Sequence, residues 1–359
     1  MERALKLAEK GRRSTSPNPM VGACVVRKGR LLGEGYHRRF GGDHAEVDAL
    51  KAAGSRCRGA TLYVTLEPCV SWGKTPPCVN AIVQARICRV VVAALDPNPR
   101  NHGKGVAALR RSGLEVRTGV LGREAAAQNE AFFKYVRTGL PFVTLKMAQS
   151  IDGKIATAKG QSRWISSPAS LVFVHRLRAE QDAIMVGTRT LFLDNPRLTP
   201  RVPAPGRDPQ KPWRVVLDAD CRIRPWARVL KGPQLTLVAV SERVLKSISN
   251  KHAGSKKSIT LLGVPEKRGR LNLRVLLGRL ASLGVAKLLV EGGGELAWSL
   301  LSEGLADRAY WTLAPKIIGG RSAKTSVEGD GIRDLSRPIR ASFTRIERLG
   351  DDVLIRTDF

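Results

Sequence analysis

Short apolar segments alternate with amphipathic ones along most of this chain, and the alternation constrains the fold more than any other feature. In the first part, β-branched runs such as Thr61–Leu66 and Arg89–Ala94 are typical of buried strands. Segments such as His44–Ala53, Cys78–Arg86 and Arg123–Arg137 are typical of helices. The expected order is helix, strand, strand, helix, strand, helix, strand, helix, which indicates a layered α/β domain.

A turn sequence at Thr138–Pro141 interrupts the pattern, after which strands and helices resume. The 359 residues fit two domains at the usual domain size. Two later segments, the proline-rich Pro200–Pro212 and the basic Lys251–Lys257, are expected to be loops. We therefore predict two α/β domains, residues 1–141 and 142–359.

The charge balance points to anionic partners. The chain holds 61 Lys and Arg against 31 Asp and Glu, a net charge of +30. Nucleic acid, acidic membranes and phosphorylated small molecules all suit such a balance. Because the excess is spread over both predicted domains, no segment looks like a basic tail that wraps nucleic acid.

The cysteine count and the N-terminus bear on the compartment. Six cysteines are too few for a disulfide scaffold at this length, which favours a reducing compartment. No apolar run approaches the roughly 18 residues that a membrane span needs. The N-terminus lacks the apolar core of a secretory signal, and Glu2–Gly11 fits a surface helix better than a short organellar transit peptide. We predict a cytoplasmic protein that contacts no membrane.

Four residues in the first domain form a pattern with a specific chemistry. His44 and Glu46 stand at the start of a predicted helix, Cys69 follows a strand, and Cys78 opens the next helix. One imidazole and two thiolates form a ligand set for catalytic zinc, with the fourth position left for water. A carboxylate at Glu46 can take a proton from that water and pass it to a leaving amine. Two other interpretations of these residues remain. They are a surface histidine with two unrelated buried thiols, or a structural zinc site closed by a fourth protein ligand.

A histidine two residues before a glutamate, followed by Pro-Cys, is the signature of zinc-dependent nucleobase deaminases. Deaminases that act on nucleic acid have two residues between their cysteines. Here eight residues separate Cys69 from Cys78, and they bring Lys74 towards the predicted pocket. This spacing counts against a deaminase directed at nucleic acid, which the net charge alone would favour.

With further motifs, the chain resembles the bifunctional riboflavin-biosynthesis deaminase/reductases along nearly its whole length. In the first half the matching motifs are Pro17–Gly22, Gly33–His37, His44–Val47, Thr65–Cys69, Gly73–Cys78 and Asp96–Pro99. In the second half they are Leu145–Gly153, Trp164–Ser166, Arg178–Ala179, Asp182–Ile184, Gly187–Thr190, Asp194–Arg201 and Glu291–Gly293.

The resemblance implies two reactions and two folds. The family deaminates a diaminopyrimidinone that carries a phosphoribosylamino group, and then reduces the ribose to ribityl with NADPH. The first domain is expected to have the three-layer α/β/α fold of cytidine deaminases and the second a fold like dihydrofolate reductase. The implied partners are the phosphorylated pyrimidine, Zn²⁺ and NADPH, with a homo-oligomer expected and no nucleic acid.

The resemblance also implies roles for particular residues. In the deaminase, His44, Cys69 and Cys78 bind zinc, Glu46 is the proton shuttle, and the substrate contacts are Asn18, His37, Lys74, Asp96 and Asn98. In the reductase, the cofactor contacts are Ala148, Trp164, Thr190, Asp194, Gly293, Gly294, Glu295 and Leu296. The reductase substrate contacts are Lys146, Ser162, Arg178, Leu198, Arg201 and Glu291.

Several of these residues have a simpler interpretation as turn formers. Asn18 and Asn98 lie between prolines, Asp194 precedes Asn-Pro, and the glycines after Glu291 fit a tight strand-to-helix turn. One position departs from the family, because Ser71 stands where a histidine that contacts substrate is usual. A reductase with a weakened deaminase half is therefore an alternative, and Trp72 either stacks on the pyrimidine or caps its loop.

Overall fold

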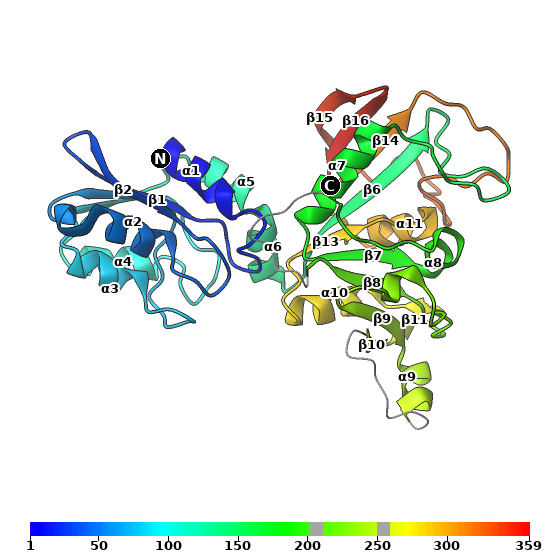
Figure 1. The fold of residues 1–359 in the computed structure, drawn as a ribbon, viewed down its shortest axis with the longest axis horizontal. Helices are drawn as coiled ribbons and strands as arrows, with labels where there is room; N and C mark the ends of the chain where they lie inside the picture. Colours follow the sequence, from blue (N-terminus) through cyan, green and yellow to red (C-terminus); the bar gives the residue numbers. More distant parts are fainter. Residues whose placement is uncertain (202–210, 250–258) are drawn as a thin grey trace. The chain divides into compact units, whose positions relative to one another are not determined.

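The computed structural model describes residues 1–201, 211–249 and 259–359. The chain divides into two compact units, Met1–Leu140 and Pro141–Phe359 (Figure 1). The boundary expected from the sequence lies one residue further along. The loop expected at Lys251–Lys257 lies outside the described residues, as does most of the one expected at Pro200–Pro212.

The first unit is built on a five-stranded sheet in the order β2-β1-β3-β4-β5. The strands are β1 (Gly22–Arg27), β2 (Arg30–Tyr36), β3 (Thr61–Leu66), β4 (Arg89–Ala94) and β5 (Glu115–Thr118). Strand β1 runs antiparallel to both β2 and β3, while β3, β4 and β5 are mutually parallel. The α/β class expected from the sequence is confirmed, although β5 was not anticipated.

Helices cover both faces of this sheet, which gives three layers (Figure 1). They are α1 (Glu2–Ala8), α2 (Ala45–Ala53), α3 (Cys78–Gln84), α4 (Lys104–Arg111), α5 (Gly122–Gln128) and α6 (Glu130–Thr138). Alternate residues of β1 face opposite layers: Cys24 packs with Ala4 and Leu7 of α1, whereas Ala23 and Val25 belong to the larger core. The single helix expected at Arg123–Arg137 is two helices that meet at Asn129.

Two glycines on β2 set the position of α2. A Cβ atom at Gly33 would lie 2.4 Å from the carbonyl oxygen of Ala49, and one at Gly35 would lie 2.6 Å from that of Ala45. Any side chain there would push the helix away from the sheet. This close packing fixes the first turn of α2, where Glu46 stands.

The second unit holds a nine-stranded sheet in the order β10-β9-β8-β7-β13-β6-β14-β16-β15. The strands are β6 (Phe142–Ser150), β7 (Ala183–Gly187), β8 (Trp213–Leu217), β9 (Thr236–Ser241), β10 (Ile259–Val264), β13 (Lys287–Val290), β14 (Arg308–Ala314), β15 (Ser342–Leu349) and β16 (Asp352–Asp358). All neighbours from β10 to β14 are parallel, and β16 and β15 continue the sheet antiparallel. A separate hairpin joins β11 (Glu266–Lys267) to β12 (Arg270–Leu271).

The helices of this unit are α7 (Pro168–Ala179), α8 (Thr188–Asp194), α9 (Glu242–Ser249), α10 (Leu273–Ser282) and α11 (Gly294–Ser302). Because its central strands are parallel, their carboxyl ends share one edge, where open α/β sheets place ligands. Strands β6, β7 and β13 end at that edge in Ser150, Gly187 and Val290. Among the described residues, no helix is both long and apolar enough to cross a membrane.

Candidate functional site

Three side chains in the first unit converge in a geometry that suits a metal ion. His44 Nδ1 lies 3.1 Å from Cys78 Sγ and 3.6 Å from Cys69 Sγ, and all three ligand atoms lie within 4.8 Å of one another. Bond lengths of about 2.0–2.3 Å in a tetrahedral zinc site place such atoms roughly 3.5–4 Å apart. The 3.6 Å distance from His44 to Cys69 falls in this range, and the 3.1 Å distance to Cys78 is somewhat shorter. The donor set of the described residues fits zinc, and three ligands leave one tetrahedral position open.

Each ligand comes from the end of a different element. His44 is the N-cap of α2, Cys69 follows the end of β3, and Cys78 is the first residue of α3. The backbone N–H of Cys78 donates to Cys69 Sγ at 3.3 Å. His44 Nε2 lies 3.4 Å from Thr75 Oγ1, which leaves Nδ1 as the nitrogen facing the sulfurs.

The two thiols have opposed acidities. Hydrogen bonds from Cys78 and His44 outweigh burial and lower the pKa of Cys69 to about 4. The same contact with Cys69, together with burial, raises the pKa of Cys78. At least one thiolate therefore stands ready at neutral pH, and a dication among the three residues would favour the second.

Glu46 lies beside this cluster and is 3 % exposed. Burial raises the pKa of its carboxyl group, partly offset by the nearby His44. A carboxyl group with a raised pKa holds a proton more readily than an ordinary carboxyl group, which suits a residue that accepts a proton during a reaction.

A cavity of about 360 Å³ opens onto the cluster. Among the predicted residues, Asn18, His37, His44, Glu46, Cys69, Lys74, Asp96 and Asn98 line it. Cys78 is fully buried behind the lining. Ser71 also lines the cavity, whereas Trp72 is 76 % exposed and does not belong to the lining.

His37 is held as a neutral imidazole at one wall of this cavity. Its Nδ1 lies 2.9 Å from the carbonyl oxygen of Asp43, and its Nε2 lies 3.1 Å from Asn18 Nδ2. The carbonyl can only accept, so Nδ1 carries the proton and Nε2 accepts from the amide of Asn18. Burial lowers the pKa of His37, which keeps the ring neutral.

The lining of this cavity also holds polar groups that bond to one another. Asp96 accepts from the backbone N–H of Asn98 and from the side chain of Asn101, and burial raises its pKa. Asn98 Oδ1 accepts from the N–H of Arg100, so this residue forms a turn and also lines the cavity. Lys74 lies with its Nζ 4.0 Å from the centre of the Phe40 ring.

The residues of this cavity that sequence reasoning missed include Phe40, Glu67, Asn101 and Phe132. The buried Glu67 accepts three backbone N–H groups, from Asp96, Gly103 and Val106, and so fixes the loop that carries Asn98. Glu67 belongs to a motif already noted, but nothing in the pattern shows this role. No local signal marks Phe132, which looks like any apolar residue of an amphipathic helix.

The second unit has its own cavity, of about 520 Å³, at the carboxyl edge of the parallel sheet. Of the residues predicted for the reductase, the following line it: Lys146, Ala148, Ser162, Trp164, Arg178, Thr190, Asp194, Leu198, Arg201, Glu291, Gly293 and Gly294. Glu295 and Leu296 do not. Glu295 pairs with Arg270 at 3.2 Å, and Leu296 is buried beneath Gly292.

A buried charge cluster lies at the floor of this cavity. Arg178 donates two hydrogen bonds of 2.6 Å to the Glu291 carboxylate. Although burial alone would raise the pKa of Glu291, Arg178 and Lys146 lower it. Burial lowers the pKa of Lys146, an effect that Glu291 opposes and Arg178 reinforces.

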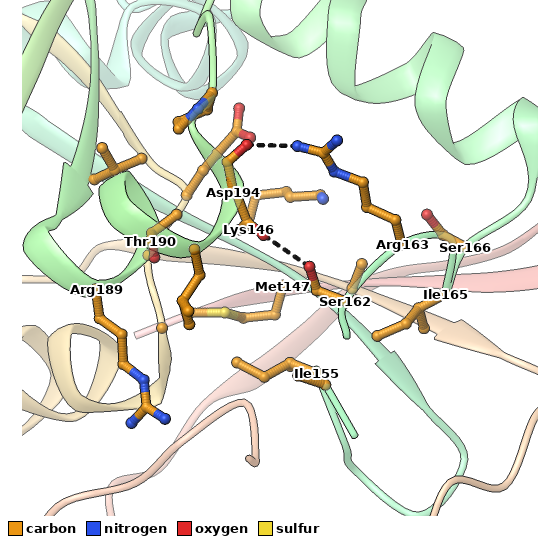
Figure 2. A pocket seen from close by; sticks show the side chains of 18 of the residues that line it. Lys146, Met147, Ile155, Ser162, Arg163, Ile165, Ser166, Arg189, Thr190 and Asp194 are labelled. Atoms are coloured by element: carbon orange, nitrogen blue, oxygen red, sulfur yellow. Dashed lines mark hydrogen bonds between the residues drawn. The ribbon is translucent and has the colours of Figure 1, made fainter. Parts of the chain in front are cut away.

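The loop between β6 and α7 closes one side of the cavity and is tied to the end of α8. Ser162 Oγ donates to Asp194 Oδ1 at 2.8 Å, and Arg163 donates to the backbone carbonyl of Asp194 at 2.5 Å (Figure 2). Asp194 is thus the last residue of a helix and also an acceptor for the facing loop. The sequence did not predict this helix, and Asn195, which follows it in a left-handed backbone conformation, makes Asp194-Asn195-Pro196 the turn that ends the helix.

Among the charged side chains of the lining, basic ones outnumber acidic ones. Beyond the predicted residues, the cavity is lined by Arg163, Arg189, Arg197, Arg228 and Lys324, with Glu328 as a further acid. Figure 2 shows Arg189 and Arg163 reaching towards opposite sides of the pocket. A cavity of this size and charge suits phosphorylated ligands.

Comparison with known proteins finds one matching family for each part of the chain. The family described as the RibD C-terminal domain matches residues 141–355, and the cytidine and deoxycytidylate deaminase zinc-binding region matches residues 1–94. The riboflavin biosynthesis protein RibD of Aquifex aeolicus is 41 % identical over 99 % of this chain and 96 % of its own length. That of Escherichia coli is 38 % identical over 99 % of this chain and 97 % of its own.

Solved structures agree as well. RibD of Acinetobacter baumannii has a TM-score of 0.89 at 35 % identity and covers 99 % of this chain and 97 % of its own. A Thermotoga maritima protein has a TM-score of 0.86 at 35 % identity, covers 100 % of this chain and 97 % of its own, and is described as a diaminohydroxyphosphoribosylaminopyrimidine deaminase/5-amino-6-(5-phosphoribosylamino)uracil reductase. The resemblance carried by the motifs is confirmed: this chain belongs to the RibD family of bifunctional deaminase/reductases of riboflavin biosynthesis.

Proposed function

We propose that residues 1–141 deaminate 2,5-diamino-6-(5-phosphoribosylamino)pyrimidin-4-one and that residues 142–359 reduce the ribosyl group of the product to ribityl with NADPH. The observation that carries this proposal is the presence of two unlike cavities. One holds His44, Cys69 and Cys78 beside a buried Glu46, and the other is a basic pocket at a sheet edge. The description of the Thermotoga maritima relative names both activities.

In the deaminase, His44, Cys69 and Cys78 would hold zinc, which supplies a Lewis acid that makes water nucleophilic near neutral pH. Glu46 takes the proton that this water releases and delivers it to the departing amine. Its burial raises the pKa of its carboxyl group, which makes that group a better proton acceptor than an ordinary glutamate.

Substrate recognition in the deaminase falls to the groups around the metal cluster. Asn18 and His37 present an ordered pair to the pyrimidine, and Asp96 and Asn98 border it from the other wall. Lys74, exposed at the rim over Phe40, supplies a compact charge for the phosphate. Ser71 lines this cavity at a position where the family commonly has a histidine. This difference supports a second candidate function, a reductase whose deaminase half binds its substrate more weakly.

In the reductase, NADPH supplies the hydride, and the protein's part is to hold the opened ribose against it. Lys146 lines the cavity beside the ionised Glu291, where its ammonium group can polarise a ribose oxygen and donate a proton to it. Arg178, Arg201, Ser162 and Leu198 would hold the substrate. The cofactor would lie against Ala148, Trp164, Thr190, Asp194 and the two glycines Gly293 and Gly294 at the start of α11.

Replacing Glu46 with Gln tests the assignment of two separate sites. The amide keeps the shape of the side chain but cannot shuttle a proton, so ammonia release should fall by roughly 10²–10⁴-fold with zinc content unchanged. NADPH oxidation on substrate that is already deaminated should persist at the wild-type rate. Simultaneous loss of both activities in the folded variant would sink the two-site assignment.

The proposal extends to the protein's surroundings. We propose a cytoplasmic homo-oligomer that binds small phosphorylated ligands and no nucleic acid. Support comes from the long spacing between Cys69 and Cys78 and from the position of basic residues inside a cavity of small-molecule size.

A further inference from the structure

Asn129, at the junction of α5 and α6, uses its side chain to bind the backbone of a distant residue. Its Oδ1 accepts from the N–H of Met20 at 2.8 Å, and its Nδ2 donates to the carbonyl of Met20 at 2.8 Å. The side chain is buried, at 4 % exposure. The amide therefore gives Met20 the two hydrogen bonds that a neighbouring strand would otherwise provide.

The segment held in this way is a wall of the deaminase cavity. Asn18, Pro19 and Val21, which flank Met20 on both sides, all line it. Asn18 in turn donates to His37 Nε2 at 3.1 Å. Three residues after Asn129, Phe132 lines the same cavity from α6. We call the pair of hydrogen bonds between Asn129 and Met20 the clamp. The clamp thus joins the segment around Met20 to α6, and both line the cavity, although Asn129 itself does not.

Only an amide of this length meets both requirements of Met20. An Asp carboxylate has the same shape but can only accept, so one oxygen would face the carbonyl of Met20 without a proton between them. Alanine would leave both backbone groups without their partner, and glutamine would push the segment outwards. Each lost bond to a poorly solvated backbone group is costly compared with the small net gain from an ordinary hydrogen bond.

We propose that Asn129 is a positioning residue of the deaminase, one that sets the place of Asn18 and, through it, of His37 at the pyrimidine. This inference rests on the proposed function of that cavity. It adds a residue that lies outside every sequence motif and 109 positions away from the segment it controls. It also gives α6 a part in the site, because Phe132 and the clamp belong to the same turn of chain.

The variant Asn129→Asp tests the proposal through pH. At pH 8 the ionised carboxylate should raise the KM for the pyrimidine about tenfold, because the bond to the Met20 carbonyl is lost, while kcat changes little. Below the pKa of the new carboxyl group, a proton can again be donated to that carbonyl. The ratio of variant to wild-type KM should therefore fall towards one between about pH 8 and pH 5.5.

Three controls separate a local effect from a general one. Zinc content and reductase activity on pre-deaminated substrate should match those of the wild type. Gln84→Glu adds the same charge at an exposed position of α3. It should leave unchanged the KM of the deaminase for the pyrimidine and the KM of the reductase for the pre-deaminated substrate. Wild-type deamination in the same assay tests the proposed function itself, independently of Asn129.

Two results would overturn the proposal. One is a wild-type KM for Asn129→Asp at every pH. The other is a parallel fall of zinc content and both activities that low pH does not reverse, which would make Asn129 a residue of general stability only.

Discussion

Lys146, Arg178 and Glu291 share one buried pocket floor, so the charge of each depends on the others. Glu291 stays ionised because Arg178 and Lys146 outweigh the effect of burial, and their attraction keeps its pKa below the ordinary value. Lys146 loses its proton more easily than an exposed lysine does, because burial lowers its pKa and Glu291 only partly opposes this effect. At the residue scale the reductase is therefore expected to depend on pH through Lys146.

Glu291→Gln should move the alkaline limb of the reductase profile to lower pH. Because the pKa of Lys146 is lowered, the protonated amine is present at low pH and is lost as pH rises through that value. Removing the Glu291 charge removes the contribution that raises this pKa, so the loss should come earlier. The measurement is kcat/KM for NADPH oxidation against pH on pre-deaminated substrate.

The matched control is Glu295→Gln, which removes an acid from the first turn of α11 outside the cavity lining. It should leave the alkaline limb in place. An alkaline limb that stays fixed in Glu291→Gln, or moves to higher pH, would show that Lys146 does not carry the titration.

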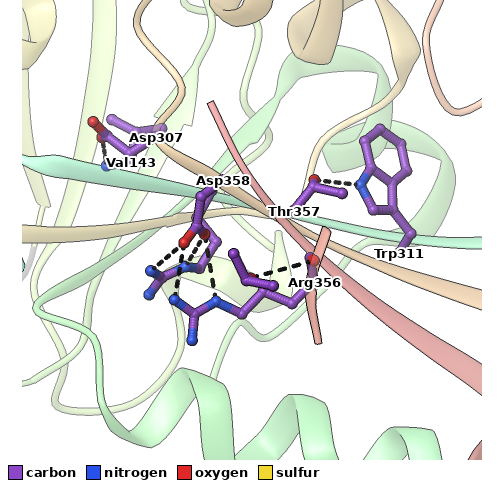
Figure 3. A network of polar contacts seen from close by, with 8 residues as sticks. Val143, Asp307, Trp311, Arg356, Thr357 and Asp358 are labelled. Atoms are coloured by element: carbon purple, nitrogen blue, oxygen red, sulfur yellow. Dashed lines mark hydrogen bonds and ion pairs between the residues drawn. The ribbon is translucent and has the colours of Figure 1, made fainter. Parts of the chain in front are cut away.

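At the scale of elements, ion pairs join the neighbouring strands β14 and β16 in the sheet of the second unit. Arg308 on β14 is 7 % exposed and bonds to Asp358 on β16 through its Nε at 2.6 Å and an Nη at 3.1 Å. Arg356 donates to the same carboxylate at 3.0 Å, and Trp311 bonds Thr357 across the same strand pair (Figure 3). Burial would raise the pKa of Asp358, but the two arginines outweigh it and lower the pKa.

Asp358→Asn should destabilise the second unit by about 2–4 kcal/mol at neutral pH, because the buried Arg308 would lose the carboxylate that its guanidinium binds through two nitrogens. The pKa of Asp358 is depressed, so its contribution is present above the ordinary carboxyl pKa and is lost as pH falls through the folded value. Urea unfolding at neutral and acidic pH measures this. The control is Asp351→Asn, which removes an exposed carboxylate just before β16. If it lowers the free energy of unfolding by as much, the ion pair is not the cause.

The sequence predicted those elements whose own residues decide their structure. Thr61–Leu66 and Arg89–Ala94 are strands with the expected bounds, since buried β-branched runs have few alternatives. The break between α5 and α6 was not predictable, because the two short hydrogen bonds of the Asn129 side chain are made with Met20, far away in the sequence. Strand β5 was missed because only Val116 of its four residues is buried.

The candidate sites divide in the same way. The zinc ligands and Glu46 follow from spacing, because metal chemistry accepts few residue types. Asn101 and Glu67 do not, since their roles are hydrogen bonds to a loop that only the folded chain brings near. Glu295 and Leu296 were expected in the reductase cavity, but the first turn of α11 directs both side chains elsewhere.

For the whole molecule, basic residues that line the two cavities account for part of the net charge of +30. Lys74 at one site and Arg178, Arg201 and their basic neighbours at the other can receive the phosphates of substrate and cofactor. The rest of the excess is spread over both units, and nothing in the structure explains it. The central claim is accordingly about chemistry in two places on one chain.

Incubating the zinc-loaded wild-type protein with the diaminopyrimidine phosphate, with and without NADPH, tests this claim most directly. Without NADPH, mass spectrometry should find a product in which one amine is replaced by oxygen, together with free ammonia. With NADPH, the product should also carry two added hydrogens. Substrate returned unchanged under both conditions, or a reduced product formed without ammonia, would contradict the account.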